Sequence, residues 1–219
     1  LLCNLAKVKI RVRLPLPAHK KAKRLHGRSL FAIMSVVMNT PQKPPHKTWL
    51  SEKIEIHSSP IGGCGMFAAK AIDQDEVVLI WGGTYANEKQ AVKAKGSGKL
   101  VMQWDEDLFS IENRGEDQGY FLNHSCDPNV WMNDAYTLSA RQPIAKGEEI
   151  TADYALWEAN EDKISAWDCC HCQSRNCRKK ITGKDWEIPE LQTKYRNHLS
   201  PLLNKRIANK NICKTETYS

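Results

Sequence analysis

The sequence predicts a small, mainly β fold with short helices. Apolar and polar residues alternate in short runs, and residues that favour turns separate these runs. A chain of 219 residues can form one domain that buries a substantial core, together with tails. Short strands at this spacing are typical of a small β-rich domain.

The expected strands follow one another through the middle of the chain. Ile54 and Ile56 alternate with polar residues in the run 53–57. Asp73-Gln74-Asp75 is expected to form a turn between two strands within the apolar stretch 66–81. Five more short strands are expected, in order, at 100–104, 108–111, 130–132, 136–140 and 149–151.

Two helices are expected. The first covers 86–94 and ends at Gly96-Ser97-Gly98. Pro189 can open the second, and Pro201 is expected to end it. One face of this second helix would carry apolar and aromatic side chains that pack rather than take part in chemistry, namely Leu191, Tyr195, His198 and Leu199.

Charge is distributed unevenly along the chain. Residues 1–50 contain 11 Lys or Arg and no acidic residue, whereas residues 52–168 contain 21 acidic and 10 basic residues, a net charge of −11. Such a body would attract a Lys-rich protein and repel nucleic acid, although an ordinary solvated acidic surface has the same composition. Residues 1–48 are expected to be a disordered, Pro-containing tail and linker. Contact with nucleic acid is expected only through this basic tail.

Cysteine spacing favours a metal site. Four of the eight cysteines lie within residues 169–177, too close together for a framework of long disulfide loops. Metal ligation implies a reducing compartment, so we expect an intracellular protein of the cytoplasm, with the nucleus or delivery into a host cell as alternatives. No apolar run approaches the ~18 residues that a membrane-spanning helix needs.

Four segments occur in an informative order. They are Gly63-Cys64-Gly65-Met66-Phe67-Ala68, Asn123-His124-Ser125-Cys126-Asp127-Pro128-Asn129, Gly147-Glu148-Glu149-Ile150-Thr151-Ala152-Asp153-Tyr154, and Cys170-His171-Cys172 followed by Cys177. Together they resemble the motifs of SET-domain protein-lysine N-methyltransferases that carry a post-SET zinc segment. The resemblance covers roughly 54–178, and the compact chain looks most like stand-alone or prokaryotic members.

This resemblance implies a SET-domain (β-clip) fold, in which the segment with the last motif is threaded, like a pseudoknot, through a loop of the preceding chain. It suggests a SET domain at 52–156, a post-SET zinc segment at 157–180, and a C-terminal helical extension and tail at 181–219. It also implies transfer of methyl groups from S-adenosyl-L-methionine to the ε-amine of lysine. The substrate would be a basic, Lys-rich protein, with histone-like and ribosomal proteins as candidates.

Methyl transfer to lysine requires a neutral amine. Free lysine has a pKa near ~10.4, so neutrality near pH 7 costs about 3 to 4 pKa units at about 1.36 kcal/mol each. A narrow channel with apolar and aromatic walls lowers the amine pKa by desolvation and aligns the amine with the methyl group. The protein therefore has to supply geometry and electrostatics.

The resemblance assigns roles to individual residues. Tyr154 would be the catalytic residue, its hydroxyl directed at the methyl group. A Tyr that follows a strand is otherwise usually half-buried packing. The resemblance also implies a set of cofactor-binding residues, for which plain turns and core packing are the alternatives: Gly63, Cys64, Gly65, Asn123, His124 and Trp167.

The substrate channel departs from the family pattern. Trp81 stands where a channel Tyr is frequent, and Tyr120 stands where an Arg commonly precedes the Asn-His motif. Ala152 stands where many members carry Phe or Tyr, so it leaves room for further methylation unless another aromatic residue fills the space. We expect Trp81, Ala152 and Trp157 to line the channel.

Three thiolates of the cysteine cluster need a fourth ligand. A structural zinc ion is tetrahedral, and Cys170, Cys172 and Cys177 supply three positions. The resemblance implies that Cys126 is the fourth ligand. Cys169 and His171 are competing ligands that the spacing does not exclude.

Two other functions compete with the enzyme. A catalytically silent SET-like module with zinc would hold Lys-rich segments without turnover. A hydrolase built on Cys126 and His124 would lack an obvious orienting group and oxyanion turn. Binding of S-adenosyl-L-methionine would separate a methyltransferase from a hydrolase.

Overall fold

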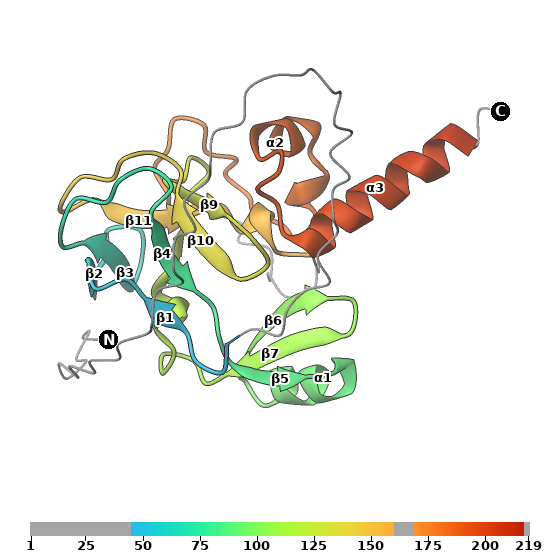
Figure 1. Ribbon diagram of the computed structural model, residues 1–219, viewed down its shortest axis with the longest axis horizontal. Coiled ribbons are helices and arrows are strands. Elements are labelled where there is room, and N and C mark those ends of the chain that lie inside the picture. The colour runs from blue at the N-terminus through green and yellow to red at the C-terminus, as the bar shows by residue number, and fades with distance from the viewer. Residues whose placement is uncertain (1–44, 160–168, 217–219) are drawn as a thin grey trace, which may run out of the picture.

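The computed structural model describes residues 45–159 and 169–216, with side chains described as far as residue 210 (Figure 1). The mainly β fold with short helices is confirmed. The strands form three small sheets. Trp167 and most of the predicted N-terminal tail lie outside the described residues.

The first sheet is antiparallel. Its strand order is β1 (Trp49–Leu50), β4 (Val77–Ile80), β10 (Thr137–Ala140) and β9 (Val130–Met132). All four residues of β10 are buried, as expected for an inner strand with neighbours on both sides.

The second sheet contains the strand of the Gly147 to Tyr154 motif. Its strand order is β2 (Ile54–Ser58), β3 (Cys64–Ala68), β11 (Glu149–Ala152) and β8 (Asn123–His124). β11 pairs with β3 in antiparallel fashion and with β8 in parallel fashion. Asn123 therefore lies beside Thr151, and His124 beside Ala152.

The third sheet and a helix lie below the other two sheets in Figure 1. Its order is β5 (Thr84–Ala86), β7 (Leu108–Glu112) and β6 (Leu100–Asp105). Helix α1 (Glu88–Gly96) packs on this sheet through Ala91 and Ala94. Asn87 caps the helix, since its side chain accepts the N–H of Gln90 while the Gln90 side chain accepts the N–H of Asn87.

The expected strands are all present, and most lie within about two residues of their predicted limits. The exception is β3, which ends at Ala68 although the predicted turn starts only at Asp73. The sequence did not predict β1, β5 and β8. These strands are two or three residues long, too short for an alternating pattern to stand out.

The prediction of one helix between Pro189 and Pro201 is wrong. Helix α2 (Pro189–Lys194) is short, and Pro201 begins helix α3 (Pro201–Glu216) instead of ending the second helix. Proline lacks an N–H group, and the first turn of a helix has no acceptor for one, so proline suits a helix start. Ser200 supplies the cap, because its Oγ accepts the N–H of Leu203 at 3.3 Å.

The core joins the C-terminal region to the sheets. Ile72, Leu79, Leu138 and Ile150 are fully buried together with residues of the C-terminal region, namely Trp186, Leu191, Tyr195, Leu199 and Leu203. Leu191, Tyr195 and Leu199 therefore pack in the core as predicted, and His198, which is half-buried, stacks on Trp131. The division of the chain after 156 and after 180 stays a prediction.

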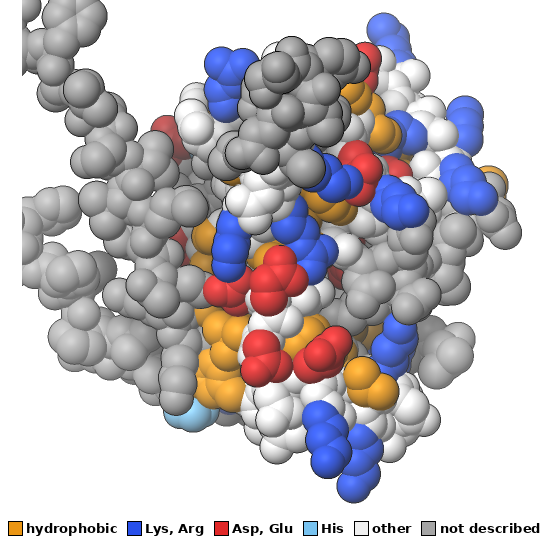
Figure 2. Space-filling model, turned by 90° about the vertical axis from the view of Figure 1, so that its right-hand side faces the viewer, with side chains coloured by type: hydrophobic (Ala, Val, Ile, Leu, Met, Phe, Trp, Pro, Cys, Tyr) orange, Lys and Arg blue, Asp and Glu red, His pale blue; other side chains and the backbone are white. Residues whose placement is uncertain are grey.

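Ion pairs fasten α3 to the turn between β6 and β7. Arg206 binds Glu106 with an Nη2 to Oε2 distance of 2.6 Å, and Lys205 Nζ lies 3.7 Å from Asp105 Oδ1. Figure 2 shows acidic side chains at the centre of one face of the molecule, with basic side chains around them. Within the described residues, no helix has the length and apolar character needed to cross a membrane.

Candidate active site

Four cysteine thiols meet at one point. The Sγ atoms of Cys126, Cys170, Cys172 and Cys177 all lie within 4.8 Å of one another. Cys126 follows β8, whereas the other three come from the segment after residue 168, so the cluster joins two distant parts of the chain. The competing ligands Cys169 and His171 are exposed and do not belong to this group.

The surroundings of the thiols suit a cation. Burial raises the pKa of Cys126, and it raises the pKa of Cys170 to about 11. Burial also acts to raise the pKa of Cys172, but hydrogen bonds from the N–H groups of Cys126 and Ser174 and from the Cys170 and Cys177 side chains together lower this pKa to about 7. A divalent metal ion would replace the thiol protons and compensate the buried charge.

His124 lies between the cysteine cluster and Tyr154 and contacts both. Its Nδ1 accepts the backbone N–H of Tyr154 at 3.3 Å, and its Nε2 lies 3.3 Å from Cys126 Sγ. Burial lowers the pKa of His124 to about 4, so the ring is neutral near pH 7. A neutral ring that accepts at Nδ1 carries its proton on Nε2, and this N–H donates to the sulfur.

Tyr154 begins a short 3-10 turn, η2 (Tyr154–Leu156). Its hydroxyl donates to the carbonyl oxygen of Leu122 at 2.8 Å. Its ring packs edge-on against His124, with centroids 5.1 Å apart, and lies 5.5 Å from the ring of Trp157. Burial raises the pKa of Tyr154 above its ordinary value, so the hydroxyl stays protonated at neutral pH.

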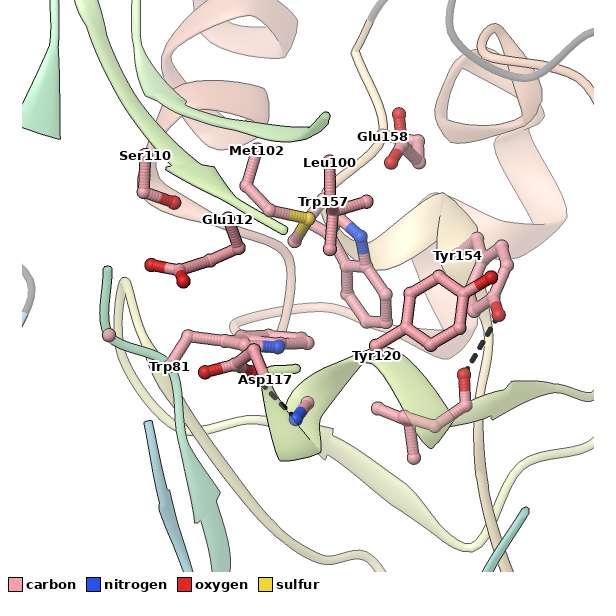
Figure 3. Close-up of a pocket in the computed structure, with 13 residues that line it drawn as sticks. Trp81, Leu100, Met102, Ser110, Glu112, Asp117, Tyr120, Tyr154, Trp157 and Glu158 are labelled. Atoms are coloured by element: carbon pink, nitrogen blue, oxygen red, sulfur yellow. Dashed lines mark hydrogen bonds between the residues drawn. The ribbon is translucent and has the colours of Figure 1, made fainter. Parts of the chain in front are cut away.

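An aromatic pocket lies beside Tyr154 (Figure 3). Its volume is about 150 Å³, and aromatic, aliphatic and acidic side chains line it. The aromatic rings are those of Trp81, Tyr120, Tyr154 and Trp157, and the carboxylates are those of Glu112, Asp117 and Glu158. In Figure 3, Glu112 and Asp117 lie on the opposite side of the pocket from Tyr154.

Two of the three predicted channel residues line this pocket. Trp81 and Trp157 pack edge-to-face with ring centroids 4.7 Å apart. Ala152 is fully buried in β11 as part of the core and is not a lining residue of this pocket.

The glycine motif lies against Asn123. The Nδ2 group of Asn123 donates to Cys64 O at 3.1 Å and to Glu149 Oε1 at 2.7 Å. A Cβ atom on Gly65 would overlap Glu149 Oε1 and crowd Asn123 Nδ2, so a larger residue would displace these two side chains. Gly63 has a φ of +58°, the left-handed region that glycine adopts most readily.

The sequence reasoning missed several residues at this site. Glu149 fixes the Asn123 amide and also accepts a hydrogen bond from Ser59 Oγ at 2.7 Å. Asp153 receives both Nη groups of Arg178, at 2.6 and 2.8 Å. Asp153 directly precedes Tyr154, and Arg178 directly follows Cys177. This adjacency to predicted site residues was the signal in the sequence that could have identified them.

The comparison with known families identifies the central region. Residues 63–155 match the family described as the SET domain. This part of the chain is a SET domain. The match contains the glycine motif, Asn123, His124, Cys126 and Tyr154, so the SET-domain prediction made from the sequence is confirmed.

Curated relatives of this SET domain carry related names. The chain is 27% identical over 148 residues to histone-lysine N-methyltransferase trithorax of Drosophila virilis. This alignment covers 62% of the chain and 4% of that protein. It is 26% identical over 150 residues to human histone-lysine N-methyltransferase 2D, covering 61% of this chain and 3% of that protein. A Candida albicans histone-lysine N-methyltransferase, H3 lysine-36 specific, is 26% identical over 147 residues, covering 60% of this chain and 17% of that protein.

Proposed function

We propose that this SET domain transfers methyl groups from S-adenosyl-L-methionine to the ε-amine of lysine in a protein substrate. The observation that carries the proposal is the position of Tyr154. This residue lies within the SET match, its side chain lines an aromatic pocket, and its hydroxyl is protonated at neutral pH. The names of the curated relatives support the same reaction.

The pocket can recruit a lysine and then favour its neutral form. Glu112 and Asp117 attract the ammonium group from one side of the pocket. The rings of Trp81 and Trp157 contribute cation–π attraction and desolvation. Desolvation acts against these attractions and against the charge of Glu158 near Tyr154, and it disfavours the charged amine; methyl transfer requires the neutral form.

Tyr154 would orient the reacting amine. Its hydroxyl donates a hydrogen bond to Leu122 O, and the oxygen of a phenol can also accept one from an amine. S-adenosyl-L-methionine supplies an activated methyl group when bound. Because the methyl is already activated, alignment of the amine is the main contribution that the protein has to make.

The glycine motif and Asn123 fit a cofactor with an amino-acid end. The Nδ2 group of Asn123 is held by Cys64 O and Glu149, so its amide oxygen is the atom that can accept from an ammonium group. Gly63 is exposed, its φ lies in the left-handed region, and a Cβ added there would meet no described atom within 4 Å. We assign the backbone near Gly63, Cys64, Gly65 and His124 to cofactor contact.

The cysteine cluster fits a structural zinc ion. Tetrahedral zinc with Zn–S bonds of ~2.3 Å places its sulfur atoms about 3.8 Å apart. Cys126 Sγ and Cys170 Sγ are 4.0 Å apart, and all four Sγ atoms lie within 4.8 Å. The ion would hold the segment that carries Cys170, Cys172 and Cys177 against the SET domain, in a reducing intracellular compartment.

A methylation assay tests the proposal. Purified protein is incubated with labelled S-adenosyl-L-methionine and a panel of histones, ribosomal proteins and unrelated acidic proteins, and mass spectrometry maps the modified lysines. We expect labelled lysine in basic proteins. Cofactor binding without turnover on any panel member would favour the silent binding module instead.

Replacement of Tyr154 provides the residue-level test. Tyr154→Phe should lower kcat about a hundredfold because the amine loses its orienting oxygen, while cofactor affinity changes by less than about threefold. Tyr136→Phe is the matched control, because the Tyr136 hydroxyl is buried and has no hydrogen-bond partner among the described residues. Unchanged turnover in Tyr154→Phe would refute the assigned role.

A further inference from the structure

A buried ionic network surrounds the residue before Tyr154. Asp153 is fully buried, and each of its carboxylate oxygens accepts one Nη group of Arg178, at 2.6 and 2.8 Å. Tyr195 Oη donates to Asp153 Oδ2 at 3.0 Å, and the backbone N–H of Ala155 donates to Asp153 Oδ1 at 3.0 Å. The carboxylate therefore has two donors on each oxygen.

Arg178 has a second acidic partner. Its Nε donates to Asp185 Oδ2 at 2.9 Å. Asp185 in turn accepts the N–H and the hydroxyl of Thr182, at 3.1 and 2.7 Å. These bonds fix the guanidinium plane in the orientation that the bidentate contact with Asp153 requires.

The network joins three separate parts of the chain. Asp153 lies within the SET match, and Arg178 directly follows the last cysteine of the cluster. Asp185 lies in the 3-10 turn η3 (Asp185–Glu187), and Tyr195 caps α2. Asp185 and Tyr195 therefore lie outside residues 63–155, in the C-terminal extension.

Asp153 controls the local geometry of Tyr154. It is the N-cap of η2, and its bond to the Ala155 N–H sets the turn that begins with Tyr154. A buried carboxylate follows its donors closely, because a lost hydrogen bond leaves charge uncompensated in a medium of low polarity. A shift of Asp153 would therefore move the Tyr154 backbone and the direction of its hydroxyl.

We propose that Tyr195 and Asp185 are positioning residues for methyl transfer, so that the C-terminal extension completes the catalytic unit by fixing Asp153 and the turn that carries Tyr154. This inference rests on the proposed function. Neither residue lines the aromatic pocket, so both act through Asp153 and Arg178 rather than by contact with substrate.

Steady-state kinetics of Tyr195→Phe test the inference. This variant keeps the ring in the core and removes one donor to Asp153. We expect kcat to fall about tenfold, which matches the loss of one hydrogen bond to a charged group, with KM for peptide and cofactor changed less than about twofold. Tyr136→Phe removes a buried hydroxyl that has no partner within residues 45–159 and 169–210, and it should leave kcat unchanged.

Amide hydrogen exchange adds a readout that does not depend on activity. The Ala155 N–H should exchange faster in Tyr195→Phe than in the wild type and in Tyr136→Phe, because its acceptor is less firmly held. Asp185→Asn keeps the side-chain size but removes the charge that orients Arg178. It should lower kcat and speed Ala155 exchange in the same way, with metal content unchanged.

The outcomes separate the two claims. A wild-type protein that never methylates lysine would refute the proposed function, while exchange at Ala155 would still decide whether Tyr195 holds Asp153. An active wild type with normal kcat and normal Ala155 exchange in Tyr195→Phe would overturn the positioning role. An equal loss of kcat in Tyr136→Phe would also overturn it, since the effect would then be general core damage.

Discussion

At Glu112, a carboxylate lies half-buried against the pocket wall, and its Oε1 accepts the N–H of Thr84 at 3.1 Å. Burial raises the pKa of Glu112, and the nearby Asp117 charge raises it further. The folded protein thus holds a negative charge where folding disfavours it. Such strain is typical of residues kept for binding rather than for stability.

Glu112→Gln should separate stability from binding. Because the folded-state pKa is raised, the destabilising charge is present at pH 7 and absent below the unfolded pKa near ~4.3. The variant should therefore have a higher Tm than the wild type at pH 7 and the same Tm near pH 4. It should also show a several-fold higher KM for a basic peptide.

Thermal unfolding at several pH values and peptide kinetics check this prediction. Glu52→Gln is the control, since Glu52 is exposed and does not line the pocket. A lower Tm for Glu112→Gln at pH 7, or an unchanged KM, would contradict the proposed role of this carboxylate.

The segment that carries Cys170, Cys172 and Cys177 is held in place by contacts with other parts of the chain. Residues 169–180 form no regular helix or strand among the described residues. Their attachment comes from the thiols, from the Arg178 N–H that donates to Cys126 Sγ at 3.3 Å, and from the ion pairs of Arg178. A metal ion at the thiols would therefore decide whether this segment keeps its place.

Cys172→Ser should lower both metal content and activity. We expect the purified wild type to hold about one zinc ion per chain, and the variant to lose most of it because a serine hydroxyl is a much weaker zinc ligand. Elemental analysis and methyl-transfer rates measure the two effects. Cys169→Ser should match the wild type, since Cys169 is exposed outside the cluster; full activity after complete metal removal would refute the coupling.

Helix α3 shows that a proline can mark either the end of one helix or the start of the next. Pro201 follows a stretch in which Leu191, Tyr195 and Leu199 share a buried side, so a proline there indicated the end of one helix. In the structure, Asn197 adopts a φ of 68°, which interrupts the chain before Pro201. Pro201 then occupies the first position of a new helix that Leu202 and Leu203 anchor in the core.

At the scale of the whole molecule, charge and pocket chemistry agree. Residues 52–168 carry a net charge of −11, and acidic side chains line the aromatic pocket. A basic protein segment is therefore attracted before it makes close contact. This attraction weakens with added salt, because the Debye length falls from about 10 Å at 0.1 M to about 3 Å at 1 M.

Salt should affect recruitment more than chemistry. Between about 0.05 and 0.5 M NaCl, KM for a Lys-rich peptide should rise several-fold while kcat stays within about twofold, since the pocket interior is shielded from ions. Peptide titrations at each salt concentration measure this. A peptide with its flanking lysines replaced by glutamine is the control and should show little salt dependence; equal dependence for both peptides would contradict electrostatic recruitment.

The sequence by itself determined the mainly β architecture, most of the strands, α1 and the SET domain. Alternation in strands and the spacing of motifs are local properties, and packing left them unchanged. The residues in the motifs also pointed to Tyr154 and to a thiol cluster, because those functions require particular side chains in a fixed order.

Only the tertiary structure decided which residues meet. It joined Cys126 to three thiols more than 40 residues away and left the adjacent Cys169 outside. It placed Ala152 in the core and set Glu112 at the pocket. It also brought Tyr195 to Asp153, a hydrogen bond between residues 42 positions apart. Such contacts depend on how sheets and loops pack, and a linear pattern carries no record of distances between segments remote in sequence.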